Sequence, residues 1–548
     1  MKKISACLGR NRIKKITAML VMVSLLAGCG TVGDGKDKTL SVAITSKILT
    51  LDQHKMYDIH SASCAALTYS MLYRFDERNN PIPYMAESSE VSEDGLTYTI
   101  HIREGLKYSN GEPITAMDYA DSFKRFIDPD TGAMLASYLI DNSIVVNARD
   151  INLGKLGVDE LGVETPDAHT LVVHLEKPCP FFFSVLASPS LSPFDQKFYE
   201  SCAGSYGSSP DTVLSSGPYI VDRYEPLGTE THFIKNPYFV DKDEIYMDEI
   251  TIRSVADAQQ SMMCYQTGLV DIINIYRDFV KLVNGDPALN INTGSTAYYI
   301  KGNSKTKNPW NNKNIRIALS LAIDRESYAH NVENDLMEPL TGLIPRGLAK
   351  EPDGSDFCDD TVRYPDVCSY DPDRARDYFE KGLSELGTDH IKMKLIFMPT
   401  YQQIAEVVIQ NWKKVFPELE IEPRSMQSNQ LVAELAGNDY DIDITGWVGD
   451  FPDTTSFFII LREKNSTNFE GYVNREFEEV MKKSELETDP EKRSKLLHEA
   501  EDIIMNDLAL IPIVSTGLSR LINTDIKGMV QGIGGSLPYY FTARRENG

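Results

Sequence analysis

The first 29 residues constrain the rest of the chain most, because they carry the parts of a secretory leader in order. An apolar run over residues 16–26 follows a basic head, and Leu-Ala-Gly-Cys closes the segment at 26–29. The basic residues of the head are Lys2, Lys3, Arg10, Arg12, Lys14 and Lys15. Such a head, an apolar run too short to span a bilayer and small residues at its end are typical of a cleaved signal peptide. We therefore predict that residues 1–28 are removed and that the rest folds outside the cytoplasm.

The tetrapeptide at 26–29 also matches a lipobox, in which Cys29 becomes the new N-terminus and carries lipid. Acyl chains hold a protein at a membrane by burying methylenes, at about 0.8 kcal/mol each, so a lasting anchor needs more than one chain. Residues 29–38 are polar and glycine-rich, as in a flexible tether. The alternative is an ordinary transmembrane anchor, but the short apolar run and the polar tether favour lipidation of Cys29.

The composition describes an acidic, multidomain globular protein. The chain has 548 residues, enough for about three or four domains, and its hydrophobic content of 42% can fill several cores. Its net charge is −25, and removal of residues 1–28 with their six basic side chains makes it −31. This charge repels nucleic acid and anionic lipid headgroups. We expect a soluble monomer on the extracytoplasmic face of the membrane, held there only by its lipid.

The cysteines disfavour a metal site. Six of them follow Cys29, and none forms a Cys-x-x-Cys pair or lies beside His at zinc spacing. Cys358 and Cys368 flank a short loop, which a disulfide would close in an oxidising exterior. Two free thiols are the alternative, and the sequence leaves both open. The five aspartates between 353 and 366 lack EF-hand spacing, so a solvated surface explains them better than a calcium site.

Local patterns predict an α/β fold, because strands and helices alternate in the second half of the chain. Strand patterns occur at 39–44, 98–102, 395–397, 419–423 and 440–445. Helical spacing of apolar residues occurs at 314–325, with its charged end at Asp324 and Arg325, and at 372–383 and 404–416. Thr115 and Asp371 are expected helix caps.

The chain lacks the common catalytic motifs. It has no Gly-x-Ser-x-Gly elbow, no His-Glu-x-x-His, no Walker loop and no strand-linked dinucleotide-binding glycine motif. A cell-surface protein of this size without such motifs is better explained by binding than by catalysis, and we expect no cofactor. A surface hydrolase or peptidase with scattered catalytic residues escapes a motif search and stays as the alternative.

Five segments occur in an order that is typical of one family. They are residues 51–55, 103–116, 216–219, 316–325 and 446–453. Together they resemble the extracellular solute-binding proteins of peptide ABC importers, solute-binding family 5 of the oligopeptide-binding type. The similarity extends over nearly all of the chain after the leader.

The resemblance implies a two-lobed periplasmic-binding-protein-like clamp of type II, with an extra domain inserted in the first lobe. The expected boundaries are 39–70, 195–298 and 519–548 for lobe I, 71–194 for the inserted domain, and 299–518 for lobe II. Closure about a hinge would bury an extended peptide between the lobes. The chain must then cross between the lobes twice.

The resemblance places the ligand site at residues 446–453, which follow the strand pattern at 440–445. Ligands collect at strand ends in α/β sheets. In the family, the Asp that matches Asp450 pairs with a peptide's α-ammonium, and backbone groups matching Gly446, Trp447 and Val448 bond to the peptide main chain, with Gly449 between them and the acid. Bonds to the main chain suit a site that accepts many sequences. The alternative for Asp450 is an exposed loop carboxylate.

Further contacts are implied by the resemblance. Trp447 is expected to wall a side-chain pocket, Tyr57 and Ile59 to touch the peptide backbone from lobe I, and Tyr298 and Tyr299 to lie at a crossing. Plain packing is the alternative for each of these five. Neutral Ile444, Ser428, Gln402 and Gln403 stand where relatives place charged or aromatic residues. Recognition of the peptide's C-terminus is therefore left open.

The expected function is that of a lipoprotein that captures short peptides and delivers them to the permease subunits of an ABC importer. Within the same fold, the alternatives are a nickel chelate, a haem or a signalling peptide as ligand.

Overall fold

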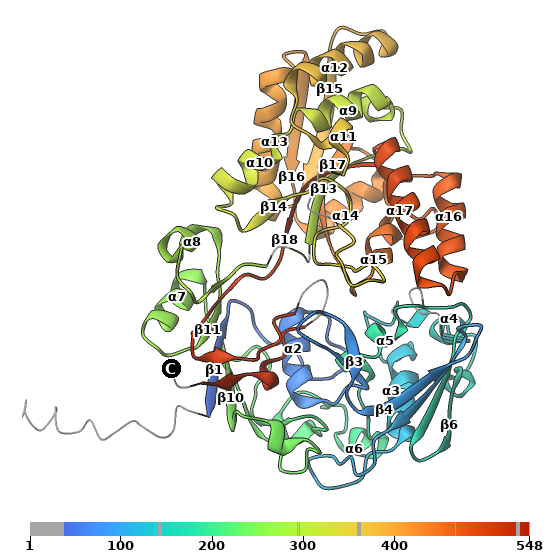
Figure 1. Ribbon diagram of the computed structural model, residues 1–548, viewed down its shortest axis with the longest axis vertical. Helices are drawn as coiled ribbons and strands as arrows, with labels where there is room; N and C mark the ends of the chain where they lie inside the picture. The colour runs from blue at the N-terminus through green and yellow to red at the C-terminus, as the bar shows by residue number, and fades with distance from the viewer. Residues whose placement is uncertain are drawn as a thin grey trace, which may run out of the picture.

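The computed structural model describes residues 38–137, 139–140, 145–292, 294, 296–358, 363–465, 467–532 and 537–546. The leader, Cys29 and the tether before Lys38 lie outside the described residues, as do Asp359 and Asp360 of the acidic loop. The described chain forms an upper and a lower body (Figure 1). No helix within the described ranges is both long enough and apolar enough to cross a membrane.

A mixed sheet of seven strands organises the lower body, lobe I. Across the sheet the strands are β12 (Leu289–Asn290), β19 (Arg520–Ile522), β11 (Ile272–Asn274), β1 (Thr39–Ile44), β10 (Glu249–Ser254), β9 (Glu230–Lys235) and β8 (Tyr219–Arg223). β1 has the predicted bounds and pairs in parallel with β10 and β11. Its side chains alternate between two cores, with Leu40 and Val42 in one and Ala43 in the other. The helices of this lobe are α2 (Ile59–Thr68), α6 (Gln196–Ser201), α7 (Ala258–Gln266) and α8 (Arg277–Val283).

An antiparallel sheet of four strands lies beside lobe I and forms the inserted domain (Figure 1). Its order is β4 (Ala86–Val91), β5 (Thr97–Ile102), β7 (Thr170–His174) and β6 (Val163–Asp167). The helices of this part are α3 (Ala116–Ile127), α4 (Ala148–Asn152) and α5 (Phe182–Val185). Thr115 directly precedes α3, and its N–H donates to Asp118 at 2.8 Å, as expected for a helix start. Ile100 shares one hydrophobic core with Leu40 of lobe I, so the inserted domain is fused to lobe I by packing.

A sheet of six strands organises the upper body, lobe II. Across the sheet the strands are β14 (Met337–Pro339), β18 (Leu510–Thr516), β13 (Thr296–Gly302), β17 (Ile442–Val448), β15 (Ile391–Phe397) and β16 (Leu419–Ser425). β15 pairs in parallel with β16 and β17, whereas β13 runs antiparallel to β17 and β18. The α/β prediction for the second half of the chain is confirmed.

Helices cover both faces of this sheet. The longer ones are α9 (Lys313–Leu321), α12 (Pro372–Leu386), α13 (Gln402–Val415), α14 (Ser428–Gly437), α16 (Arg475–Leu486) and α17 (Pro490–Asp507). The short ones are α10 (Arg325–Ser327), α11 (Pro365–Cys368) and α15 (Thr455–Phe458). Two short strand pairs complete the fold: β2 (Tyr73–Phe75) with β3 (Pro81–Pro83), and β20 (Ile526–Lys527) with β21 (Arg544–Arg545). Asp371 caps α12 by accepting from the N–H of Arg374 at 3.0 Å, as predicted.

The helix predicted over 314–325 is wrong at its end, because α9 stops at Leu321 and Asp324 caps a separate short helix. Arg325, expected at the charged end of that helix, is 3% exposed. Its guanidinium donates to the carbonyls of Pro512 at 2.7 Å and Cys368 at 2.9 Å, and these bonds compensate its burial.

Two chain segments connect the lobes side by side. The first leads from β12 to β13 and the second from β18 to β19, so both join neighbouring strands of one sheet to neighbouring strands of the other. They are tied together where the N–H of Asn292 donates to Ser519 Oγ at 3.0 Å. Two adjacent crossings provide a natural hinge. The architecture is a two-lobed clamp, with an extra domain on its first lobe.

Cys358 and Cys368, the two cysteines of the possible disulfide, both lie in buried positions. α11 turns Cys368 towards the buried Arg325, whereas Cys358 lies near Arg363 and Glu501. Burial raises the pKa of both thiols to about 11. Such thiols are unreactive at neutral pH.

Candidate ligand-binding site

Asp450 lies between the lobes, two residues after the end of β17. Gly449, which connects it to the strand, is buried so closely that a Cβ there would lie 2.5 Å from the Leu348 side chain. This close packing fixes the direction in which the chain leaves the sheet. The Asp450 side chain lines a cavity of about 90 Å³ whose other walls come largely from lobe I and the inserted domain.

No described residue neutralises the Asp450 carboxylate, which accepts no hydrogen bond and forms no ion pair within the part of the chain that the structure covers. Burial therefore raises its pKa to about 6. Asp453, three residues later, is a useful contrast. Burial also disfavours its charge, but Arg493 donates to both of its oxygens at 2.9 and 3.0 Å, and the net effect is a lowered pKa. Asp450 is thus a partly buried acid that lacks the cation given to its neighbour.

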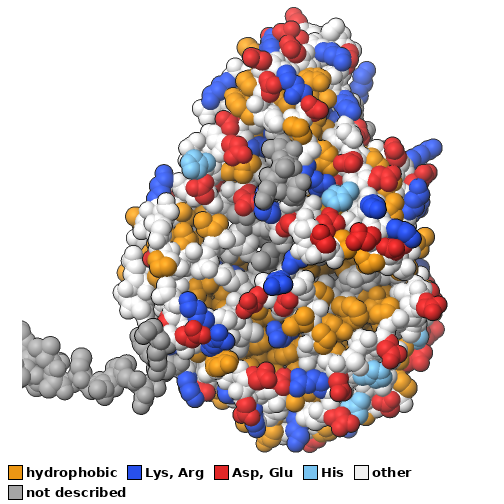
Figure 2. Space-filling model, in the orientation of Figure 1, with side chains coloured by type: hydrophobic (Ala, Val, Ile, Leu, Met, Phe, Trp, Pro, Cys, Tyr) orange, Lys and Arg blue, Asp and Glu red, His pale blue; other side chains and the backbone are white. Residues whose placement is uncertain are grey.

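The remaining walls of this cavity are mostly apolar. Side chains that contribute carbon surface include Met56, Phe75, Leu135, Val185, Phe451 and Leu537. Asp450 is the one charged group among the described lining residues. Ser190 is fully buried, and its Oγ has no hydrogen-bond partner among them. Figure 2 shows hydrophobic side chains gathered on the lower body, next to the hollow that separates it from the upper body.

The end of β17 has an open backbone edge. Its pairing with β13 continues to Val448, which faces Thr296, whereas its recorded pairing with β15 ends at Ile444. No second strand pairs with residues 445–448 within the described chain, although the Tyr401 hydroxyl hydrogen-bonds to the Gly446 backbone. An unpaired edge offers N–H and C=O groups to an additional extended chain.

The predicted residues on β17 divide between this edge and the core. Gly446 lies under the Tyr298 ring, where a Cβ would approach a ring carbon to 2.7 Å. Trp447 is partly buried, and its Nε1–H donates to the Ser456 carbonyl at 2.7 Å, so it anchors the start of α15. Val448 is 55% exposed. Trp447 thus packs against the core of lobe II and attaches the end of β17 to α15.

Tyr298 and Tyr299 point to opposite faces of the sheet, as neighbouring strand residues do. Tyr299 is 1% exposed and belongs to the core of lobe II, so its role in this structure is packing. Tyr298 is partly buried and meets the ring of Tyr401 edge-on, with centroids 5.6 Å apart. Burial raises the pKa of Tyr298 to about 12.

Tyr57 and Ile59 lie at the start of α2, where the Asp58 carboxylate caps the helix by accepting from the N–H of Ser61 at 2.9 Å. Both predicted side chains are exposed. Met56 and Ala62 of the same segment line the Asp450 cavity. The structure therefore brings this stretch of lobe I close to the acid on lobe II.

Sequence analysis missed the contacts that join the inserted domain to lobe II. Phe181 stacks on Phe451 with ring centroids 4.1 Å apart and 8° between the planes. Lys177 lies 3.5 Å from Glu485. Phe181 begins a run of three phenylalanines after two prolines, and Phe451 directly follows Asp450. These patterns are visible in the sequence, but only the fold reveals that they meet.

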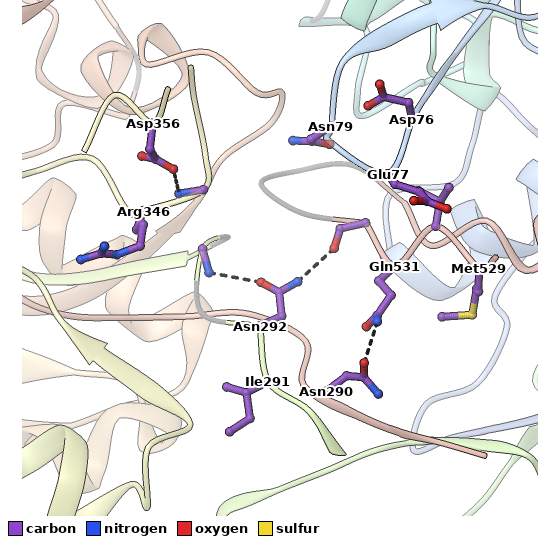
Figure 3. Close-up of a pocket in the computed structure, with 14 residues that line it drawn as sticks. Asp76, Glu77, Asn79, Asn290, Ile291, Asn292, Arg346, Asp356, Met529 and Gln531 are labelled. Carbon is purple, nitrogen blue, oxygen red and sulfur yellow. Dashed lines mark hydrogen bonds between the residues drawn. The ribbon is translucent and has the colours of Figure 1, made fainter. Parts of the chain in front are cut away.

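A larger, polar cavity of about 740 Å³ lies at the lobe junction, beside the crossings (Figure 3). Asn292 links its walls by donating to the Gly532 carbonyl at 3.0 Å, and Gln531 donates to the Asn290 side chain at 3.1 Å. Val530 lines this cavity and pairs with Tyr539, which lines the Asp450 cavity. The two cavities are therefore neighbours in one cleft. The described residues contain no cluster of His, Cys, Asp and Glu suited to a metal ion.

Comparison with known proteins identifies the fold family. The model of bacterial extracellular solute-binding proteins, family 5 (middle region), matches residues 80–469. The chain belongs to this family. Its members are binding proteins of transport systems and not enzymes. The resemblance in the sequence is thereby confirmed.

Individual relatives of this family 5 protein match it over almost their whole length. The oligopeptide-binding protein OppA of Bacillus subtilis is 29% identical over 546 residues, covering 95% of this chain and 97% of that protein. Listeria monocytogenes OppA bound to peptide has a TM-score of 0.73 at 26% identity, covering 93% and 100% of the two chains. The substrate-binding domain of an oligopeptide ABC transporter from Bacillus anthracis also has a TM-score of 0.73, at 28% identity, covering 93% and 99%.

Proposed function

We propose that this protein is the lipid-anchored substrate-binding component of an ABC importer, and that it binds short peptides in an extended conformation between its lobes. The observation that carries the proposal is Asp450, a partly buried carboxylate without a cationic partner among the described residues, next to the end of β17 that no second strand covers. A peptide supplies what both features lack, namely an ammonium group and a row of main-chain donors and acceptors. Relatives named as oligopeptide-binding support the same ligand class.

The peptide's α-ammonium pairs with Asp450 in this proposal, and its main chain runs along residues 446–448 as an added strand. Pairing with the main chain does not depend on side chains, so one site accepts many sequences. The exposed Tyr57 and Ile59 face the peptide from lobe I, and Tyr298 closes the cleft near the crossing. Gly449, closely packed against Leu348, holds Asp450 at a fixed position relative to the end of β17.

Closure joins the two lobes around the ligand. We propose that lobe I (39–70, 195–298 and 519–548) moves with the inserted domain (71–194) as one unit against lobe II (299–518). The shared core of lobe I and the inserted domain supports this division, because a continuous core resists relative motion. The paired crossings at Asn292 and Ser519 supply the hinge.

The proposal includes the location and the partner. Cys29 carries the lipid that keeps the protein at the extracytoplasmic face, and the closed clamp delivers peptide to the permease subunits in the membrane as a monomer. Mass spectrometry of protein extracted from membranes would detect acylated Cys29 after loss of residues 1–28. An intact N-terminus at Met1 would contradict the anchor.

The test of the function is calorimetry with a short peptide in two forms. A tripeptide with a free N-terminus is expected to bind, and its N-acetylated form is expected to bind at least tenfold more weakly, because it lacks the cation for Asp450. The same peptide should be recovered with unchanged mass. Equal affinities for the two forms would show that Asp450 does not recognise an ammonium group.

A further inference from the structure

We infer that the small cavity at Asp450 receives the side chain of the peptide's first residue and selects an aliphatic one of modest size. This inference rests on the proposed function and adds a substrate preference to it. It comes from three properties of the cavity: its position relative to the acid, its volume and the chemistry of its walls.

The position follows from covalent geometry. In a peptide's first residue, Cα carries the ammonium nitrogen, the side chain and the rest of the main chain. With the nitrogen held at Asp450, Cβ lies two bonds away and has to enter space next to the carboxylate. The main chain continues along the open edge of β17, where it finds hydrogen-bond partners. The cavity that Asp450 itself lines is therefore left for the side chain.

The volume limits the size of that side chain. The cavity measures about 90 Å³, whereas a cavity of about 150 Å³ is known to hold benzene in another protein. The smaller space therefore favours a branched aliphatic side chain over an aromatic ring. The walls come from α2, from the region of α5 and from Leu537, so enlarging the space requires movement of packed segments.

The wall chemistry disfavours charged side chains. Met56, Leu135 and Val185 present carbon surface, and the Tyr539 hydroxyl is already engaged, since it accepts from the Phe75 N–H at 3.3 Å. An acidic side chain would be repelled by Asp450 and would lack a cation in the described walls. A lysine side chain would compete with the peptide's own ammonium for the same carboxylate. An aliphatic side chain makes neither demand.

The first experiment measures affinities for tripeptides that differ only in the first residue, with Gly, Ala, Val, Leu, Phe, Lys or Asp at that position. Each buried methylene strengthens binding about fourfold, so Val is expected to bind about 15-fold and Leu up to about 60-fold more tightly than Ala. Phe, Lys and Asp are expected to bind more weakly than Leu by a similar factor. Equal affinities across the series, or a preference for a charged first residue, would overturn the inference.

The second experiment changes the cavity. Leu135→Ala enlarges it and should shift the preference from Leu towards Phe, whereas Ala62→Leu fills it and should shift the preference towards Gly and Ala. Leu282→Ala, at a 73% exposed position on α8, is the matched control and should leave the order of peptides unchanged. Thermal melting confirms that each variant is folded. An unchanged order in both cavity variants would contradict the inference.

The two experiments separate this inference from the proposed function. If all first residues bind equally but N-acetylation still abolishes binding, the ammonium site stands and the side-chain cavity is wrong. If N-acetylation has no effect, the proposed function itself fails, whatever the order of the series.

Discussion

An ionised carboxylate that is buried without a partner destabilises the protein that carries it. Asp450 is such a group, since its pKa is raised to about 6 by burial and no described residue offsets that cost. The nearby Asp453 shows that the same loop can hold a fully compensated acid. The proposed binding site explains the difference, because the ligand would then supply the missing cation.

Asp450→Asn is therefore expected to stabilise the free protein and to weaken peptide binding. Because the pKa of Asp450 is raised in the folded protein, its negative charge lowers the free energy of unfolding by about 2–3 kcal/mol at neutral pH. This destabilisation disappears as the pH falls below the pKa of the unfolded chain, about 4. Loss of the desolvated ion pair weakens binding by about 2–5 kcal/mol. Urea unfolding and calorimetry measure the two effects. Destabilisation of the free protein would show that Asp450 has a structural partner.

Peptide affinity is expected to depend on pH through the same carboxylate. Pairing with an ammonium lowers the pKa of Asp450 below its free value of about 6, so affinity is complete above that pH and is lost as the pH falls through it, by up to tenfold per unit. Calorimetry between about pH 4.5 and 7 covers this range, and the peptide's α-amine stays protonated throughout. Asp450→Asn should show a flat profile. The same slope in both proteins would assign the pH effect to another group.

At the scale of elements, the turn from β17 to α15 determines where the acid is held. Asp453 accepts from the N–H of Thr455 at 2.9 Å and pairs with Arg493 on α17. The turn is thereby attached to the longest helix of lobe II. Asp450 is positioned by this attachment on one side and by β17 on the other.

Arg493→Ala is expected to destabilise the protein by about 3–5 kcal/mol, because it leaves Asp453 buried without its cation. It should also weaken peptide binding, since the turn that presents Asp450 loses its attachment. Chemical unfolding measures the first effect and calorimetry the second. Lys492→Ala, at the neighbouring exposed position on α17, is the control and should change stability by less than about 0.5 kcal/mol. Similar losses of stability and affinity in both variants would show that the Arg493–Asp453 ion pair does not position the turn.

Elements also show where local sequence patterns succeed and fail. The bounds of β1 and the cap of α12 could be predicted, because both signals are local. β1 has a short β-rich pattern, and α12 begins with an Asp cap followed directly by Pro372. The end of α9 could not, because Arg325 is turned inward by carbonyls of Pro512 and Cys368, which are remote in sequence. Tyr299 was predicted at a ligand contact and lies in the core. The pairing of β13 determines which of its side chains face each side of the sheet, and it places Tyr298 and Tyr299 on opposite sides.

At the scale of the whole molecule, the two lobes touch at positions distant from the hinge. The stacked rings of Phe181 and Phe451 and the ion pair of Lys177 with Glu485 join the inserted domain to lobe II. A third contact lies nearer the crossings: the Lys350 ammonium donates to the Arg78 carbonyl at 2.5 Å, and Glu77 and Asn79 on either side of Arg78 line the larger cavity. These contacts cross between the lobes, so further opening of the clamp on that side would break them.

Phe181→Ala is expected to shift the clamp towards more open conformations, because an aromatic pair contributes about 0.5–1.5 kcal/mol beyond its buried area. Small-angle scattering should show a larger radius of gyration for the free protein, and peptide dissociation should become several-fold faster. Leu153→Ala, at a 61% exposed position after α4, is the control in the same domain. An unchanged radius and unchanged dissociation rate would show that the stacked rings do not hold the lobes together.

The sequence by itself determined the α/β class, the positions of five strands, the absence of common catalytic motifs, and the family resemblance that made 446–453 the candidate binding segment. These features are encoded locally, in periodicity, caps and short motifs that operate over a few residues. The tertiary structure decided which acid is left without a cation, which strand edge is open, and which phenylalanines meet across the cleft. Those properties depend on desolvation and on contacts between segments hundreds of residues apart, which no local pattern specifies.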